Sequence, residues 1–175
     1  MSIEISDILG HLIYTTGKID IADVIVRSAV KKSATIATAE SCTGGLIGHR
    51  ITEVSGSSKA FLGGVIAYNN DVKQLGLGIQ KTTLQKFGAV SAETAEEVAK
   101  NVLLKFQADY GLSVTGIAGP TGGTKEKPVG LVYIGLACKG NITVKKLQFG
   151  DHRSRNKLRT SQSALNILRM ALIDA

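Results

Sequence analysis

The feature that most constrains this chain is the stretch 38–45, TAESCTGG, which joins an apolar segment to a helical one. Residues 34–37 predict a buried strand, and residues 46–54 predict a helix. A small, hydroxyl-rich turn between them leaves backbone N–H groups unpaired at the start of the helix and directs the positive end of the helix dipole there. Such a turn can bind an anion, or it can hold a serine beside the donors for an oxyanion. We therefore interpret Ser41 as a nucleophile or as the centre of a binding site.

Strand and helix patterns alternate along the whole chain. Helices are predicted at 1–32, 44–54, 71–75, 91–107 and 153–173, and strands at 33–39, 60–69, 110–114, 129–139 and 142–149. The first helix has Asp20 as a candidate N-cap, and Ser91 is expected to cap the helix that follows it. Gly140 and Asn141 separate the last two strands and predict an antiparallel hairpin. The last helix is expected to face inward through Leu158, Ala164, Leu165, Leu168 and Leu172. This order predicts an α/β protein with a mixed sheet between helix layers.

Composition excludes several classes of protein. With 175 residues, of which 43% are hydrophobic and 20% charged, the chain suits one globular domain, and no linker or repeat divides it. The two cysteines, Cys42 and Cys138, have neither metal-binding nor disulfide-framework spacing, which fits a reducing cytoplasm. No apolar run approaches the roughly 18 residues of a membrane span, and no signal peptide is evident. The net charge of +7 is either ordinary solubility charge or an attraction for an anionic ligand.

A second loop rich in glycine and hydroxyl groups, residues 115–124, also follows a predicted strand. Ligands of open α/β sheets sit beyond the carboxyl ends of strands, so both loops are candidate sites, although glycines can also simply turn the chain. P-loop and G-x-S-x-G motifs are absent. The three histidines lie too far apart in sequence to suggest a metal site, so no metal is expected. The S-x-x-K pairs Ser28/Lys31 and Ser154/Lys157 are interpreted as solvated helix faces.

If Ser41 is a nucleophile, it needs a base. A desolvated lysine can replace histidine, because burial lowers the pKa of the amine and frees a lone pair. Lys73 is the best candidate, since it follows a predicted strand that ends near Tyr68, and a tyrosine there could relay a proton or hold the lysine. The alternative is that Lys73 is a surface lysine of a helix and that Tyr68 borders the core with its hydroxyl in water.

The same residues resemble a known family. The segment 35–45 is similar to the signature of the CinA C-terminal domain family, and further blocks follow in order. These are residues 56–58 with 61–64 and 67–69, 73–76, 88–91 with 94–95, 114–120, 122–124 and 127–135. The resemblance covers roughly residues 18–173. It implies a single domain with that core, preceded by an N-terminal helical extension.

The resemblance implies a three-layer α/β/α sandwich and a nicotinamide-nucleotide amidase, which converts nicotinamide mononucleotide and water into nicotinic acid mononucleotide and ammonia. Ser41, Tyr68 and Lys73 match the catalytic group of the family. No metal or organic cofactor is implied, and homodimers are common in the family. On this basis, Thr43, Gly44 and Gly45 are expected to line the oxyanion or phosphate site. The second loop is expected to cradle the ribose phosphate, through Thr115, Gly116, Ala118, Gly119, Gly122 and Gly123.

The chain departs from the family pattern at two places. The family usually has proline where this chain has Ser55, which changes the stiffness of the loop but no chemical group. At the expected phosphate site, the family's Gly-Asp-Arg reads Gly-Asp-His-Arg at residues 150–153. An arginine that meets the phosphate must therefore be Arg153 or Arg155, and Arg153 is taken as the candidate.

Two alternatives to an amidase stay open. One is a non-catalytic nucleotide-binding or regulatory domain linked to competence or DNA damage. The other is nucleic-acid binding through the basic residues 152–159, which is disfavoured because no aromatic stacking residues accompany them.

Overall fold

The computed structural model describes residues 10, 13–138 and 140–173. Its centre is a five-stranded sheet in the order β2-β1-β3-β4-β5, formed by β1 (Ile36–Glu40), β2 (Phe61–Ile66), β3 (Tyr110–Gly116), β4 (Leu131–Cys138) and β5 (Asn141–Gln148). The strands β2, β1 and β3 are parallel to one another, whereas β4 and β5 continue the sheet in antiparallel pairs. The mixed sheet and the predicted hairpin are therefore confirmed.

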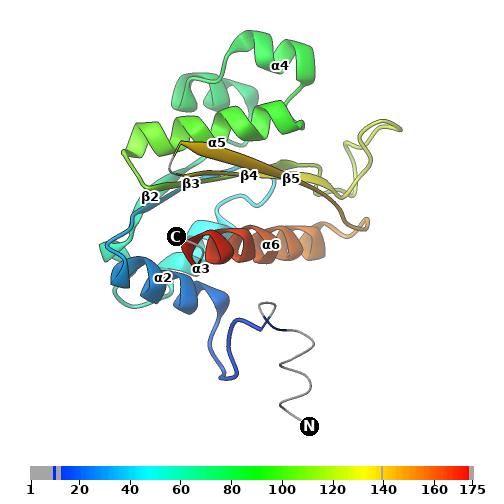
Figure 1. Cartoon of the computed structure of the whole chain (residues 1–175). Coiled ribbons are helices and arrows are strands. Elements are labelled where there is room, and N and C mark those ends of the chain that lie inside the picture. Colours follow the sequence, from blue (N-terminus) through cyan, green and yellow to red (C-terminus); the bar gives the residue numbers. More distant parts are fainter. Residues whose placement is uncertain (1–9, 11–12, 139, 174–175) are drawn as a thin grey trace.

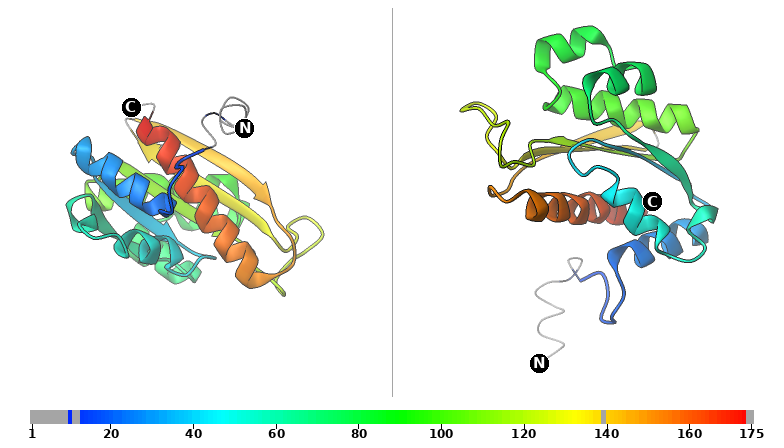
Figure 2. Two further views of the ribbon diagram at one scale, coloured as in Figure 1. Left: turned by 90° about the horizontal axis from the view of Figure 1, so that it is seen from below. Right: turned by 180° about the vertical axis from the view of Figure 1, so that it is seen from behind.

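Helices cover both faces of the sheet, which gives three layers (Figures 1 and 2). On one face lie α2 (Ile21–Lys31), α3 (Leu46–Thr52) and α6 (Arg153–Ile173), and on the other lie α4 (Lys81–Phe87) and α5 (Ala92–Phe106). Two short helices complete the described elements, η2 (Ser57–Lys59) and the π-helix η3 (Val72–Gly76). The prediction of an α/β/α sandwich with a mixed sheet is confirmed.

The central strand β1 explains why two layers of helix are needed. All five of its residues are buried, because a parallel strand in the middle of a sheet is covered on both faces. Alternate side chains enter two apolar clusters. Ile36 packs with α2, α3 and α6, while Ala37 and Ala39 pack with the side of the sheet that α5 covers. Among the described residues, no helix is both long and apolar enough to cross a membrane.

Several helix predictions were right in kind but not in extent. Asp20 caps α2 by accepting a hydrogen bond from the N–H of Ala22, and Ser91 caps α5 through Thr94 N–H. The predicted helix 1–32 is wrong for residues 13–20, which are not helical, because α2 begins only after Asp20. Residues 1–9, 11 and 12 lie outside the described part. Leu158 was expected to face inward, yet its side chain is exposed, since the inward stripe of α6 at this level is formed by Asn156 and Thr160.

Candidate active site

The site lies where three parallel strands end side by side. Glu40 at the end of β1 pairs with Ile66 at the end of β2 and with Val114 near the end of β3. The N–H of Ser41 donates to Val114 O at 3.0 Å, which continues the β1–β3 ladder by one residue. The chain exits of the three strands therefore meet at one edge of the sheet, where ligands of α/β proteins are expected.

Lys73 reaches this edge from η3 and contacts the Ser41 hydroxyl. The Lys73 Nζ lies 3.3 Å from Ser41 Oγ, 2.8 Å from the carbonyl oxygen of Ala67 and 3.5 Å from that of Asn69. Only 3% of the Lys73 residue is exposed. Desolvation lowers the pKa of its amine, and among the described residues no carboxylate forms an ion pair with it. Lys73 Nζ is thus within hydrogen-bond reach of two carbonyl oxygens and one serine hydroxyl.

The helix that carries Lys73 is of an uncommon type. Val72–Gly76 is a π-helix, in place of the short helix predicted at 71–75. Its start is held by Asn69, whose side-chain oxygen accepts from Val72 N–H at 2.8 Å and whose carbonyl accepts from Lys73 N–H at 3.3 Å. Single π-turns occur frequently at functional sites. Here the turn directs the long side chain of Lys73 back toward Ala67, which follows the end of β2, and toward Ser41.

Tyr68 borders the same cavity as Ser41 but is not joined to Ser41 or Lys73 by any hydrogen bond between described residues. Its hydroxyl accepts a hydrogen bond from Arg153 Nη2 at 2.7 Å, and 58% of the residue is exposed. The structure therefore brings Ser41 and Lys73 into direct contact and leaves Tyr68 beside them, engaged by the first residue of α6.

Glu40 is a site residue that the sequence analysis missed. It is 2% exposed, and its carboxylate accepts from the N–H groups of Gly45 at 3.0 Å, Ile47 at 3.0 Å and Gly48 at 2.8 Å. The expectation of unpaired N–H groups at the start of α3 is therefore wrong for these three residues, because the chain supplies its own anion there. An acidic residue at the end of an otherwise apolar buried strand was the available signal.

The turn formed by residues 41–45, named the reactive turn here after the candidate nucleophile Ser41, is held by hydrogen bonds within the protein. Gly44 N–H donates to Ser41 O at 3.1 Å, and Gly45 N–H donates to Glu40, so neither amide is free for a ligand in this structure. Thr43 is fully buried, and its hydroxyl has no hydrogen-bond partner among the described residues. A Cβ added to Gly44 would lie 3.6 Å from Lys157 Nζ, so this lysine of α6 stands beside the turn. The interpretation of Lys157 as part of a solvated face omitted this contact.

The second glycine-rich loop contributes through some of its predicted residues only. Gly116 and Ala118 line the cavity at Ser41. The Thr115 hydroxyl donates to Ala89 O at 2.6 Å and is therefore engaged inside the protein. Gly119 provides its carbonyl oxygen to Arg153 Nη1 at 2.9 Å. The remaining two predicted residues, Gly122 and Gly123, are exposed and are not among the residues that line this cavity.

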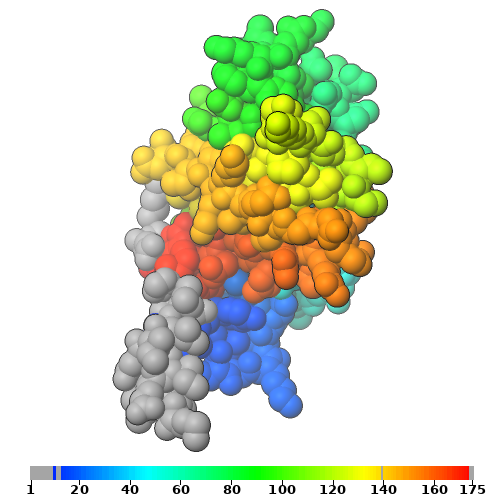
Figure 3. Space-filling model, turned by 90° about the vertical axis from the view of Figure 1, so that its right-hand side faces the viewer, coloured from blue at the N-terminus to red at the C-terminus, as the bar shows by residue number. Residues whose placement is uncertain are grey.

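The cavity at Ser41 has a volume of about 240 Å³ and is lined by Ser41, Cys42, Tyr68, Gly116, Ala118 and Arg153. Burial raises the pKa of the Cys42 thiol to about 12, and the charge of Glu40 adds to the effect. A neighbouring hollow of about 310 Å³ is lined by Pro120, Asp151, His152 and Arg153. The glycine-rich loop and the beginning of α6, which border both spaces, lie together on one face of the molecule (Figure 3). Arg155 is exposed and lines neither space.

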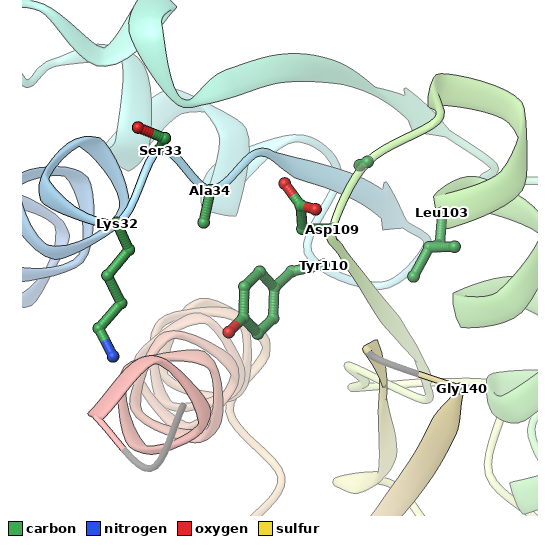
Figure 4. Close-up of a pocket in the computed structure, with 8 residues that line it drawn as sticks. Lys32, Ser33, Ala34, Leu103, Asp109, Tyr110 and Gly140 are labelled. Carbon is green, nitrogen blue, oxygen red and sulfur yellow. The ribbon is translucent and has the colours of Figure 1, made fainter.

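A larger cavity, of about 540 Å³, lies at the opposite edge of the sheet, where β1 and β3 begin. Lys32, Ala34 and Tyr110 face one another across it, with Leu103 on the far side (Figure 4). The Asp109 carboxylate beside them is engaged by the N–H and hydroxyl of Thr35, each at 2.7 Å. This cavity lies at the amino ends of the parallel strands, so the smaller one at Ser41 is the better candidate for a reactive site.

Metal chemistry has no evident donor set here. Within the described ranges, no group of three or more His, Cys, Asp or Glu residues is arranged to hold a metal ion. The ionisable side chains placed at the Ser41 turn and its cavity are those of Glu40, Lys73, Lys157 and Arg153.

Comparison with known proteins gives a consistent family. The model of the CinA C-terminal domain matches residues 18–172. A CinA-like protein of Kosmotoga olearia is 50% identical over 170 residues, which is 97% of this chain and 41% of the relative. A putative competence-damage inducible protein of Thermoanaerobacter sp. is 49% identical over 173 residues, or 99% of this chain and 42% of the relative. The chain therefore spans about two fifths of the length of these curated relatives.

Solved structures agree with the fold. The competence/damage inducible protein CihA of Agrobacterium tumefaciens superposes with a TM-score of 0.81 at 38% identity, covering 90% of this chain and 99% of that one. A CinA superfamily protein of Klebsiella pneumoniae gives a TM-score of 0.85 at 24% identity, covering 89% of this chain and 97% of that one. At that identity, the second likeness shows the fold alone.

Proposed function

The chain belongs to the CinA C-terminal domain family, and on that premise we propose that it hydrolyses the carboxamide of nicotinamide mononucleotide to nicotinic acid mononucleotide and ammonia. The observation that carries the proposal is the contact of 3.3 Å between Lys73 Nζ and Ser41 Oγ. A buried lysine whose pKa is lowered by desolvation is the kind of base that activates a serine in the absence of histidine.

The reaction then runs in two stages. The neutral amine of Lys73 takes the Ser41 proton while Oγ attacks the carboxamide carbon and forms a tetrahedral intermediate. The C–N bond breaks, the Lys73 ammonium returns its proton to the departing nitrogen, and ammonia leaves an acyl-Ser41. A water molecule then gives a proton to Lys73 and attacks the acyl carbon. The bond to Ser41 Oγ breaks, Oγ recovers the proton, and the carboxylic acid is released.

The cavity suits an anionic amide. It opens at the carboxyl ends of β1, β2 and β3, and the guanidinium of Arg153 forms part of its wall. Lys157 stands beside the reactive turn, and the chain as a whole carries a net charge of +7. These cations favour a substrate that bears a phosphate, as nicotinamide mononucleotide does. Because Gly44 and Gly45 already donate their N–H groups within the protein, we assign substrate recognition to α6 and the second loop rather than to these two amides.

The test is ammonia release from nicotinamide mononucleotide, with nicotinamide riboside and free nicotinamide alongside. Ser41→Ala should abolish ammonia release while the protein stays folded, and Ser58→Ala, at an exposed serine, should leave it unchanged. Full turnover by Ser41→Ala would remove Ser41 from the mechanism. Binding of the nucleotide without ammonia release by the native protein would favour a non-catalytic nucleotide-binding domain.

A further inference from the structure

Arg153 connects the two spaces at this edge of the sheet. It is the first residue of α6 and lines both the cavity at Ser41 and the neighbouring hollow with Pro120 and His152. Its Nη1 donates to Gly119 O at 2.9 Å, and its Nη2 donates to the Tyr68 hydroxyl at 2.7 Å. One guanidinium thus ties the second glycine-rich loop to the residue that follows β2.

Both of these acceptors are uncharged. Arg153 forms no ion pair with a carboxylate among the described residues. Hydrogen bonds from a guanidinium to an anionic oxygen are roughly twice as strong as those to a neutral oxygen, and arginine can bind phosphate through two parallel bonds. A phosphate that reaches the boundary between the two spaces should therefore displace the Tyr68 hydroxyl from Arg153.

We propose that Arg153 determines specificity as a latch: in the free protein it holds the Tyr68 hydroxyl, and the phosphate of the substrate takes the guanidinium over and releases Tyr68 to the cavity of Ser41. This inference rests on the proposed amidase function. It gives a physical reason why Tyr68 lines that cavity and yet makes no hydrogen bond to Ser41 or Lys73 among the described residues. The freed Tyr68 hydroxyl can then relay the Ser41 proton to Lys73, so the phosphate acts on the rate of the reaction as well as on binding.

The kinetic consequence separates this latch from an ordinary phosphate-binding arginine. Nicotinamide riboside lacks the phosphate and leaves Arg153 on Tyr68, so its kcat should be lower than that of the mononucleotide by about tenfold to a hundredfold, the range expected for one charge-assisted hydrogen bond. Inorganic phosphate added with the riboside should raise that kcat. If Arg153 only binds phosphate, the riboside should differ in KM alone, and added phosphate should not accelerate it.

Substitution of Arg153 provides a second test of the latch. Arg153→Ala removes both the side chain that binds the phosphate and the hydrogen bond that holds Tyr68. We therefore expect kcat/KM for the mononucleotide to fall and kcat for the riboside to rise above that of the native protein. Arg159→Ala, at an exposed position of the same helix, is the matched control. Adding Tyr68→Phe to Arg153→Ala should cancel the gain on the riboside. A lower or unchanged riboside kcat in Arg153→Ala would overturn the proposal.

A binding measurement tests the latch even if no ammonia is released. The chain has four tyrosines and no tryptophan, so its intrinsic fluorescence reports tyrosine environments. Inorganic phosphate should change this fluorescence in the native protein and in Arg159→Ala, but not in Tyr68→Phe or Arg153→Ala. The same change in Tyr68→Phe would refute the latch. Suppose instead that only proteins with both Tyr68 and Arg153 intact respond to phosphate and that none of them releases ammonia. That result would refute the amidase function and support the latch.

Discussion

The Nζ of Lys73 lies 3.3 Å from the Oγ of Ser41, although the two residues are 32 positions apart in the chain. The contact depends on two local features, the exit of the chain from β1 into the reactive turn and the π-helix that redirects the chain after β2. Because Lys73 is buried, desolvation opposes the charged form of its amine and lowers its pKa.

The first prediction concerns the pH dependence of the rate. Desolvation lowers the Lys73 pKa from the ordinary 10.5, and only the neutral amine can accept the Ser41 proton. The rate should therefore rise with pH on an acidic limb whose midpoint lies below 10.5. Lys73→Met should lower kcat by about 10²–10⁴-fold and abolish this limb. Lys59→Met, at an exposed lysine, is the control. A profile that is identical in Lys73→Met would show that another group controls it.

The second prediction concerns stability. Between the lowered pKa of Lys73 in the folded protein and 10.5 in the unfolded chain, the unfolded chain binds more protons at this site. The free energy of unfolding should therefore rise with pH across that window, and Lys73→Met should lack this contribution. Denaturant titrations of both proteins at several pH values give the difference. A difference that is constant over the window would contradict the lowered pKa.

The third prediction tests Glu40 as the support of the reactive turn. Glu40→Gln keeps the shape of the side chain but removes the negative charge and replaces one acceptor oxygen with an NH₂ donor. At least one of the three N–H groups of α3 should then lose its acceptor, at a cost of about 1–3 kcal/mol in the free energy of unfolding. Turnover should fall as well, because the turn after Ser41 loosens. Glu53→Gln, at an exposed position that ends the same helix, should leave both quantities unchanged.

The fourth prediction concerns Cys42, which neighbours Ser41 and lines its cavity. Burial raises the pKa of this thiol to about 12, so almost no thiolate exists at neutral pH. Alkylation by iodoacetamide at pH 7.5 should therefore be slow at Cys42. It can be measured by mass spectrometry in Cys138→Ala, where Cys42 is the remaining cysteine. Labelling of that variant at the rate of an unfolded-chain thiol would refute the prediction.

The fifth prediction concerns the contact between β1 and β2. A Cβ added to Gly64 would collide with the Thr38 side chain and lie 2.7 Å from the Thr38 carbonyl oxygen. Gly64→Ala should therefore lower the free energy of unfolding by about 1–3 kcal/mol. Gly17→Ala is the control, because the nearest atom to its new methyl group would lie at an ordinary distance of 3.5 Å. Thermal unfolding of both variants measures the difference, and equal melting temperatures would contradict the predicted clash.

Much of the fold follows from periodicity and turn chemistry. The caps at Asp20 and Ser91, the hairpin around Gly140 and the buried strand before Ser41 were all predicted from local residue patterns. The extent of the first helix was not, because apolar spacing marks the packed face of a helix more reliably than its ends. Leu158 was misplaced for a related reason, since polar Asn156 and Thr160 take the inward positions by hydrogen bonding to buried carbonyl oxygens.

The site was predicted in part. The hydroxyl-rich turn after a buried strand indicated Ser41, and the family resemblance added Tyr68 and Lys73. Spacing alone does not reveal that Lys73 is buried, because the π-helix that turns it inward has no simple sequence signature. The Arg153–Tyr68 hydrogen bond joins residues 85 positions apart, so only the assembled sheet and α6 bring them together.

The carboxylate of Glu40 has a consequence for how this site can change. Glu40 occupies three N–H groups at the start of α3, so these backbone groups cannot bind an anion. The groups beside the Ser41 cavity that can do so are the side chains of Arg153 and Lys157 in α6. Backbone amides cannot be replaced by point mutation, whereas these side chains can. Under the proposed function, the nucleophile and its base lie in residues 40–73, whereas the residues assigned to substrate recognition lie in the second loop and the first turns of α6. On that proposal, selection or design can alter substrate preference at α6 while Ser41 and Lys73 stay in place.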